Sequence, residues 1–370
     1  MSGVVSQSVD RTSRPSQTSA APGPQPTVRS GTTTSSGGLP TTDPVLEAEL
    51  REGLDDVEAR LRIAVANTDP LADAASRHLM EAGGKRVRPM LTLLGARLAD
   101  PTRTGVGAQV LDAAVVCELT HLASLYHDDV MDSAPTRRGV PAAHRQWNNN
   151  VAILTGDLLF ARASNVVAGL GPEAVRVQAE TFERLCLGQL HETVGPRPDE
   201  DPVAHYLDVL SDKTASLIAT AGRFGATFAG GGEDVVTAMV RYGEDVGVAF
   251  QLADDVLDLT SDVGESGKRP GTDLREGVPT LPVLLVRQAA AAGDAGAQFV
   301  VTLLDSGRLD DDGVLTEAVE ALRAHAATQA ARVTAREWAE RAMTHLARLP
   351  DSAARQALES YAGSVADRVG

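Results

Sequence analysis

The sequence predicts an all-α protein built as one large helical domain. From about Asp43 onward, apolar residues recur at helical spacing, and almost no segment shows the alternation typical of a β-strand. Glycine and proline interrupt this pattern, which leaves helices of roughly 12 to 28 residues, too many for a simple four-helix bundle. Because aromatic residues make up only 3% of the chain, we expect a core of aliphatic side chains.

The first part of the chain has a different composition. Residues 1–42 are dominated by Ser, Thr, Gly and Pro and contain almost no large apolar side chains. Such a segment cannot bury enough surface to offset the entropy of ordering its backbone. We therefore expect residues 1–42 to be a disordered tail and residues 43–370 to form the helical catalytic domain.

Charge and composition exclude several classes of protein. The net charge of −16 argues against a nucleic-acid partner, because contacts with a phosphate backbone need a basic face. No apolar run approaches the roughly 20 residues that span a bilayer, and the N-terminus lacks the pattern of a secretory signal. The two cysteines, Cys117 and Cys186, show no metal-ligand or redox spacing. We expect a soluble, cytoplasmic protein.

One short acidic pattern occurs twice, each time near the end of a long apolar helix. The two clusters consist of Asp128, Asp129 and Asp132, and of Asp254, Asp255 and Asp258. On a helix, residues at this spacing can turn toward one side, where their like charges repel. Bound Mg²⁺ would relieve this repulsion, since it takes one or two carboxylates and completes its shell with water and phosphate oxygens. A single cluster is equally well read as a solvated helix end, but two clusters in counterpart positions favour a metal site.

Cationic residues accompany both clusters. Gly83–Pro89 carries two glycines and three cations before a helix start, where cations are unfavourable, so we interpret it as a diphosphate clamp. The loop after the first cluster carries Arg137 and Arg138. Weaker candidates, any of which can be an ordinary surface or packed residue, are Lys213, Thr214, Lys268 and His121, the last of which lies two turns before Asp128.

Together these motifs resemble the trans-isoprenyl diphosphate synthases, also called the polyprenyl synthetase family. The resemblance covers roughly Gly83 to Pro282 and rests on GGKRVRP, HLASLYHDDVMD, TRRGVP, KT, FQLADDVLD and GKRPGTDLREG. It implies a helical fold around a deep cavity, with three Mg²⁺ ions bridging the six aspartates to an allylic diphosphate. The residues implied for isopentenyl diphosphate are Lys85, Arg88, His121 and Arg138. Those implied for the allylic diphosphate are Arg137, Lys213, Thr214, Gln251 and Lys268.

The implied reaction is the head-to-tail condensation of isopentenyl diphosphate with geranyl, farnesyl or geranylgeranyl diphosphate. The metal ions and Lys213 would stabilise the negative charge that develops on the leaving diphosphate. Ala123, five residues before Asp128, occupies a position where short-chain members carry a bulky aromatic. We therefore expect an open cavity and a product longer than four isoprene units, of the kind used for quinone side chains. Val278 departs from a lysine found in many long-chain members.

Three alternatives remain open. A short-chain farnesyl or geranylgeranyl diphosphate synthase would share every motif except the residue at Ala123. A terpene cyclase would share the fold but replace the second aspartate cluster, and a non-catalytic subunit would lose both clusters. The resemblance also implies a homodimer.

Overall fold

The described part of the chain consists almost entirely of helices. The computed structural model describes residues 40–260 and 270–368. Its N-terminal helices are α1 (Pro44–Val65), α2 (Pro70–Glu81), α3 (Val87–Ala99), α4 (Ala108–Met131), α5 (Ala143–Gln146), α6 (Asn149–Ala168), α7 (Pro172–Val194) and α8 (Pro202–Leu210). The remaining helices are α9 (Ser216–Phe228), α10 (Glu233–Thr260), α12 (Thr272–Glu276), α13 (Leu281–Ala291), α14 (Ala295–Leu304), α15 (Asp312–Ala324), α16 (Ala326–Leu346) and α17 (Ala353–Asp367).

Two short elements complete the described structure. A π-helical turn, η1 (Ser211–Ala215), joins α8 to α9 without a break. An antiparallel hairpin, β1 (Thr136–Arg137) and β2 (Val140–Pro141), follows α4. The predicted all-α fold is confirmed. Of the predicted tail, residues 1–39 lie outside the described residues, and Asp43 is the N-cap of α1.

Several acidic residues are structural caps. The carboxylates of Asp43, Asp69, Asp201, Asp294 and Asp311 each accept a hydrogen bond from a backbone N–H in the first turn of the helix that follows. Such caps stabilise a helix by about 1 kcal/mol each because they satisfy N–H groups that have no intrahelical partner. The two aspartate clusters are different, since both lie at the C-terminal ends of α4 and α10. Negative charge is unfavourable there.

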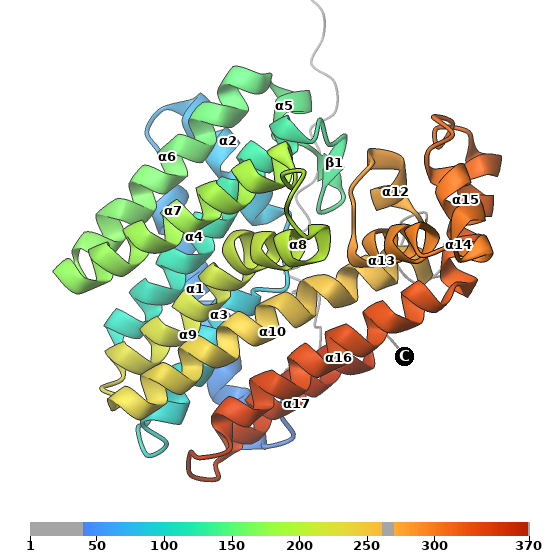
Figure 1. The fold of residues 1–370 in the computed structure, drawn as a ribbon. Coiled ribbons are helices and arrows are strands. Elements are labelled where there is room, and N and C mark those ends of the chain that lie inside the picture. Colours follow the sequence, from blue (N-terminus) through green and yellow to red (C-terminus); the bar gives the residue numbers. More distant parts are fainter. Residues whose placement is uncertain (1–39, 261–269, 369–370) are drawn as a thin grey trace, which may run out of the picture. The chain divides into compact units, whose positions relative to one another are not determined.

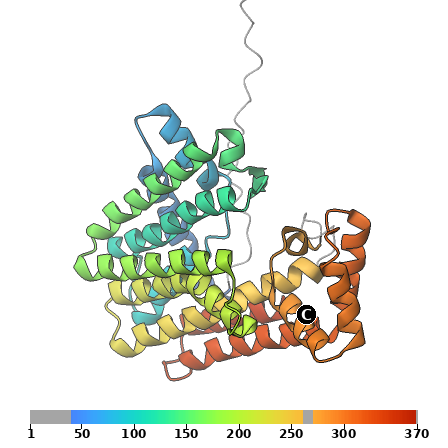
Figure 2. The same cartoon turned by 45° about the horizontal axis from the view of Figure 1, so that its top comes forward.

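The helices pack around α4, α9 and α10, as Figures 1 and 2 show. The α4 helix packs against α3, α6 and α9, and α10 runs along α9 on one side and α16 on the other. The close crossing of α3 and α9 depends on Gly225, because a Cβ there would lie 1.9 Å from the carbonyl oxygen of Thr92. Small residues therefore set how closely the helices approach.

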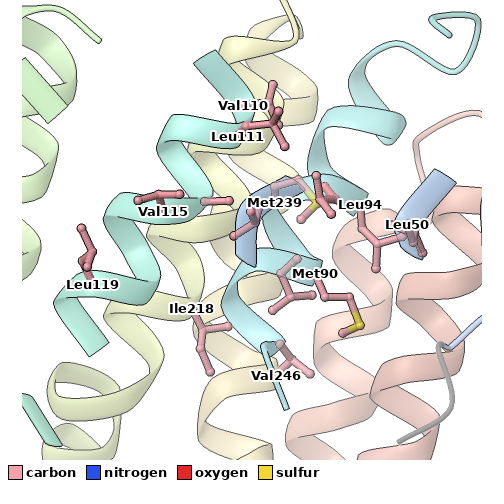
Figure 3. Close-up of a cluster of buried hydrophobic side chains, with 14 of the residues drawn as sticks. Leu50, Met90, Leu94, Val110, Leu111, Val115, Leu119, Ile218, Met239 and Val246 are labelled. Carbon is pink, nitrogen blue, oxygen red and sulfur yellow. The ribbon is translucent and has the colours of Figure 1, made fainter. Parts of the chain in front are cut away.

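The core is aliphatic, as the scarcity of aromatic residues predicted. Figure 3 shows its central cluster, in which side chains from five helices interdigitate. The labelled members are Leu50, Met90, Leu94, Val110, Leu111, Val115, Leu119, Ile218, Met239 and Val246. Complete burial of one such side chain contributes roughly 1.5–3 kcal/mol. This cluster fixes α3, α4, α9 and α10, the helices whose ends carry the candidate site.

Two helices, α4 and α6, are more apolar over their length than we expected from the sequence. By length and composition alone, α4 and α6 would be able to cross a membrane, which corrects the expectation that no segment approaches that length. In α4, 67% of the most apolar stretch is buried inside the protein, as is usual for a core helix. In α6 only 33% of that stretch is buried, and Ile153 and Leu154 are exposed large apolar side chains on this helix.

Candidate active site

A single large cavity brings together most of the residues predicted from the sequence. It has a volume of about 700 Å³, within the range of sites that bind small molecules. The predicted residues that line it are Lys85, Arg88, His121, Asp128, Asp132, Arg137, Arg138, Lys213, Thr214, Gln251 and Asp254. A much smaller hollow of about 20 Å³, between α1 and α3, holds no more than a water or two.

The first aspartate cluster divides into two parts. Asp128 and Asp132, four residues apart on the last turn of α4, both line the cavity. Asp129 points elsewhere, because adjacent residues on a helix are about 100° apart. Its side chain is fully buried and accepts a hydrogen bond from Nε of Arg137 at 2.6 Å. Asp129 therefore anchors the β1–β2 hairpin, which we did not predict.

The second cluster divides in the same way. Asp254 lines the cavity, whereas Asp255 is buried and accepts hydrogen bonds from the Tyr206 hydroxyl and, at 3.4 Å, from the Gln251 amide. Asp258 accepts a hydrogen bond at 3.1 Å from the backbone N–H of Asp273, at the start of α12. In both clusters, therefore, the first aspartate faces the cavity and the middle one is buried behind it.

Burial makes two of these carboxyl groups unusually weak acids. Burial raises the pKa of Asp128 to about 6, although the ammonium of Lys213 opposes the shift. Burial also raises the pKa of Asp255 to about 7, against the hydrogen bond from Tyr206. Burial removes water from the charged form of such a carboxylate, so a bound cation stabilises it more than it would stabilise an exposed carboxylate.

The residues of the cavity fit a magnesium ion that is completed by a substrate. Within residues 40–260 and 270–368, no three His, Cys, Asp or Glu side chains come close enough to hold a metal ion by themselves. The cavity does offer hard carboxylate oxygens from the ends of two helices, at Asp128, Asp132 and Asp254. Mg²⁺ commonly binds through one or two carboxylates and takes its other ligands from water and substrate phosphates.

The loop between α2 and α3 and the first turn of α3 supply several of the cations that line the cavity. Lys85 lies over the ring of Phe250, with its ammonium 5.7 Å from the ring centroid. Arg86 adopts a left-handed backbone with φ of 48°, immediately before the first residue of α3. Arg88 follows within the first turn of α3 and is largely enclosed, so loss of hydration lowers its pKa. Arginine nevertheless stays charged at any physiological pH.

The hairpin after α4 is tied to this loop by Arg138. Its guanidinium donates hydrogen bonds to the carbonyl of Leu79, at 3.0 Å, and to the carbonyl of Gly83. Gly84 must be a glycine, because its φ is +149° and a Cβ there would lie 2.9 Å from Cζ of Arg138. The two cationic loops therefore hold each other in place at one end of the cavity.

His121 faces this cationic end and is neutral. Burial and the neighbouring guanidinium of Arg88 hold its pKa well below the ordinary value of 6.5. A neutral imidazole can donate one hydrogen bond and accept another, but it adds no charge. His121 is therefore suited to orient an anionic ligand that the arginines neutralise.

Lys213 lies in the π-helical turn η1, between α8 and α9. The segment from α8 to α9 is helical throughout but changes from α-helix to π-helix at this turn, and π-helical turns are frequent at functional sites. Lys213 is the cation of the turn. Its ammonium forms an ion pair with Glu192 of α7. Gly188 of α7 lets the turn approach closely, since a Cβ there would lie 2.6 Å from the backbone nitrogen of Lys213.

Two further predictions have different outcomes. Lys268 lies outside the described residues. Ala123 is fully buried and packs between α4 and α6, where a Cβ on Gly156 would lie 3.1 Å from its carbonyl oxygen. Ser124, the next residue of α4, lines the cavity. The role of Ala123 in setting product length stays a prediction.

Several residues of the site escaped the sequence analysis. Phe160 and Phe182 line the cavity with ring centroids 4.2 Å apart. Arg368, near the end of the chain, forms an ion pair with Asp254 at 2.9 Å. Glu118 lines the cavity beside the arginines. Only Glu118 left a signal in the sequence, as an acidic residue in the middle of a strongly apolar helix.

Comparison with known proteins agrees with this geometry. The sequence profile of polyprenyl synthetases matches residues 69–322. The nonaprenyl diphosphate synthase of Mycobacterium tuberculosis is 43% identical over 90% of this chain and 97% of its own length. The heptaprenyl diphosphate synthase component 2 of Geobacillus stearothermophilus is 41% identical over 64% of this chain and 72% of its own length.

Similar solved structures include proteins with bound ligands. The geranylgeranyl pyrophosphate synthase of Corynebacterium glutamicum, complexed with calcium and isoprenyl diphosphate, superposes with a TM-score of 0.79. Its sequence identity is 40%, and the match covers 89% of this chain and 99% of that one.

Proposed function

The chain belongs to the polyprenyl synthetase family, and from that premise we propose that it condenses isopentenyl diphosphate head to tail with an allylic diphosphate to give a longer all-trans polyprenyl diphosphate. The observation that carries the proposal is the composition of one cavity. Carboxylates from the ends of α4 and α10 and arginines from two interlocked loops all line it. These are the groups needed to hold two diphosphates, one through metal ions and one through cations.

We assign the allylic diphosphate to the aspartate end of the cavity. Asp128, Asp132 and Asp254 would hold the magnesium ions, three of them by the family resemblance, while Asp129 and Asp255 would support the loops and helices behind them. When bound, magnesium supplies Lewis-acid stabilisation of the charge that develops on the leaving diphosphate. Lys213, whose charge already acts on Asp128, is placed to bind the same diphosphate, together with Thr214 and Arg137.

Isopentenyl diphosphate is assigned to the cationic end, at Lys85, Arg88, Arg138 and neutral His121. The allylic carbon–oxygen bond breaks, the double bond of isopentenyl diphosphate attacks the resulting carbocation, and a proton leaves the adjoining carbon. We assign that proton to the departing diphosphate. His121 is a poor base for it, because burial and the neighbouring arginines make a protonated imidazole unfavourable there. Preorganised charges of this kind typically supply much of the rate enhancement.

For the product, we propose a chain longer than four isoprene units. The similarity to a nonaprenyl diphosphate synthase over almost the whole chain supports this length. Apolar side chains, among them Leu125, Leu185 and Ile218, also line the cavity and would suit a hydrocarbon chain. The competing short-chain product is favoured by the likeness to a geranylgeranyl pyrophosphate synthase, so product length has to be measured.

We also propose a homodimer that acts in the cytoplasm. Six large apolar side chains are exposed along α6 and α7, namely Ile153, Leu154, Val175, Leu187, Leu190 and Val194. An apolar face of this kind is typical of a protein interface. A different partner remains an alternative, because one relative is named as a component. Light scattering and an activity assay of the purified protein distinguish the two. A homodimer should have twice the mass of the chain and be active, whereas a chain that needs another subunit should be a monomer without activity.

The reaction itself is tested by the release of diphosphate when both substrates are present. Purified protein with magnesium should release diphosphate only if isopentenyl and farnesyl diphosphate are added together, and Asp128→Ala should abolish the release. Glu47→Gln, which removes a charge from an exposed pair on α1, provides a matched control that should behave as the unmodified protein does. Release from farnesyl diphosphate alone would instead indicate a cyclase.

A further inference from the structure

Three arginines at the cationic end of the cavity converge on one buried carboxylate. Glu118 lies in the middle of α4, one turn before His121, and its side chain is only 2% exposed. Arg86 donates a hydrogen bond to it at 2.7 Å, and the guanidinium of Arg138 lies 4.0 Å away. Burial lowers the pKa of Arg88, and the negative charge of the nearby Glu118 opposes this shift.

Arg86 is the residue through which Glu118 acts on the loop. Its guanidinium also bonds to Glu58 of α1 at 3.0 Å and to the carbonyl of Met80 at 3.0 Å. Its left-handed backbone is unfavourable for a residue with a side chain, by roughly 1–2 kcal/mol. These bonds hold the loop in that conformation, which directs Lys85 and Arg88 into the cavity.

The arginines would otherwise repel one another. Guanidinium groups gathered in a partly dehydrated pocket destabilise each other unless an anion lies among them. Glu118 supplies an anion from the side of α4, and the arginines also line the cavity, where a diphosphate would bind. The arrangement keeps the cations assembled before the substrate arrives, which lowers the cost of ordering them on binding.

We propose that Glu118 is a positioning residue for the isopentenyl diphosphate site and that it acts through Arg86, Arg88 and Arg138. This inference rests on the proposed function, which assigns isopentenyl diphosphate to these cations. Glu118 itself does not contact the reacting atoms. Its role is to set the positions of the guanidinium groups.

The substitution Glu118→Gln separates this positioning role from a simple effect of charge, because the two explanations predict opposite changes in the affinity for the diphosphate. Removal of a negative charge beside a diphosphate site should tighten diphosphate binding if charge alone matters. If Glu118 positions the arginines, the same substitution should weaken binding, since the amide has lost the charge that attracts them. The loss of a charge-assisted hydrogen bond predicts a KM for isopentenyl diphosphate raised about tenfold to a hundredfold.

The experiment compares KM for the two substrates and adds a binding measurement without turnover. In Glu118→Gln, KM for isopentenyl diphosphate should rise while KM for farnesyl diphosphate stays within about twofold of its original value. Calorimetric titration with isopentenyl diphosphate alone, in the presence of magnesium, should show the same loss of affinity. Glu118→Asp keeps the charge and should recover part of it.

Two further variants guard against a merely structural explanation. Arg86→Lys cannot bond to two carboxylates as a guanidinium does, so it should reproduce the defect, and the double variant should be little worse than either single one. If Glu118→Gln fails to fold, Arg86→Lys alone tests the same role through the other partner of the ion pair. Glu47→Gln should leave both KM values unchanged.

The outcomes separate the inference from the function on which it rests. A protein that is inactive before any substitution would refute the proposed function. An active protein in which Glu118→Gln leaves KM for isopentenyl diphosphate unchanged, or lowers it, would overturn the positioning role. A lower melting temperature with both KM values unchanged would overturn it as well, because it would reduce Glu118 to a structural residue.

Discussion

The contact between α7 and the π-helical turn offers a sharp test of how Lys213 is positioned. The substitution Gly188→Ala adds a Cβ that would lie 2.6 Å from the backbone nitrogen of Lys213 and 3.0 Å from its Cα, whereas ordinary contacts begin at 3.4 Å. The turn must therefore move away from α7 by about 0.8 Å. Both atoms belong to the backbone, so no side-chain rotation relieves the clash.

The expected effect is larger on catalysis than on folding. Overpacking of this kind costs about 1–3 kcal/mol, which lowers the melting temperature by a few degrees in a protein of this size. A displacement of about 1 Å in a catalytic group can reduce the rate about a hundredfold. We therefore expect kcat/KM for prenyl transfer to fall by roughly tenfold to a hundredfold in Gly188→Ala, while most of the protein stays folded.

A matched substitution on another helix provides the control. A Cβ on Gly363 of α17 would meet no atom within 4 Å. Because alanine favours a helix over glycine by roughly 1 kcal/mol, Gly363→Ala should raise the melting temperature slightly and leave kcat/KM unchanged. If Gly188→Ala kept kcat/KM within twofold of the original value, the close approach of α7 would not be what positions Lys213.

Three further predictions concern the C-terminal half of α4. Asp129→Asn removes the charge that holds Arg137, so KM for the allylic diphosphate should rise about tenfold with little change in the circular dichroism spectrum; an unchanged KM would contradict the anchoring role. Burial raises the pKa of Asp128 from 3.8 to about 6, so the stability that this group contributes to the metal-free protein is present below pH 3.8 and is lost as the pH rises through 6. Added magnesium should therefore raise the melting temperature more at pH 7.5 than at pH 5.5. Equal shifts at the two pH values would count against metal binding at Asp128. Ser124→Phe should shorten the products seen by chromatography because this residue lines the cavity, whereas Ala123→Phe should chiefly destabilise the packing against α6. Shorter products from Ala123→Phe, with no change in Ser124→Phe, would instead support Ala123 as the residue that sets product length.

The sequence predicted which segments carry the chemistry better than it predicted the direction of each side chain. The spacing of the aspartates indicated a shared metal site but not that Asp129 and Asp255 are buried behind it. That distinction follows from helix geometry, since positions four apart face the same way and adjacent positions lie about 100° apart. Which of the two faces meets the cavity depends on tertiary packing.

Long-range partners left no local signal. Tyr206 hydrogen-bonds to Asp255, and Arg368 pairs with Asp254, yet both partners are distant along the chain. The left-handed backbone of Arg86 was equally hidden, because it depends on Glu58 and Glu118, two carboxylates on other helices. These contacts form only once the aliphatic core has set the helices in place.

The length of the product tests the central claim most directly. The purified protein would be incubated with magnesium, farnesyl diphosphate and excess labelled isopentenyl diphosphate, and the dephosphorylated products would be resolved by chain length beside those of Asp128→Ala. We expect a ladder of products that ends beyond four isoprene units and is absent in the variant. No incorporation of label, or a ladder that persists in Asp128→Ala, would contradict the assignment of this cavity as the site of chain elongation.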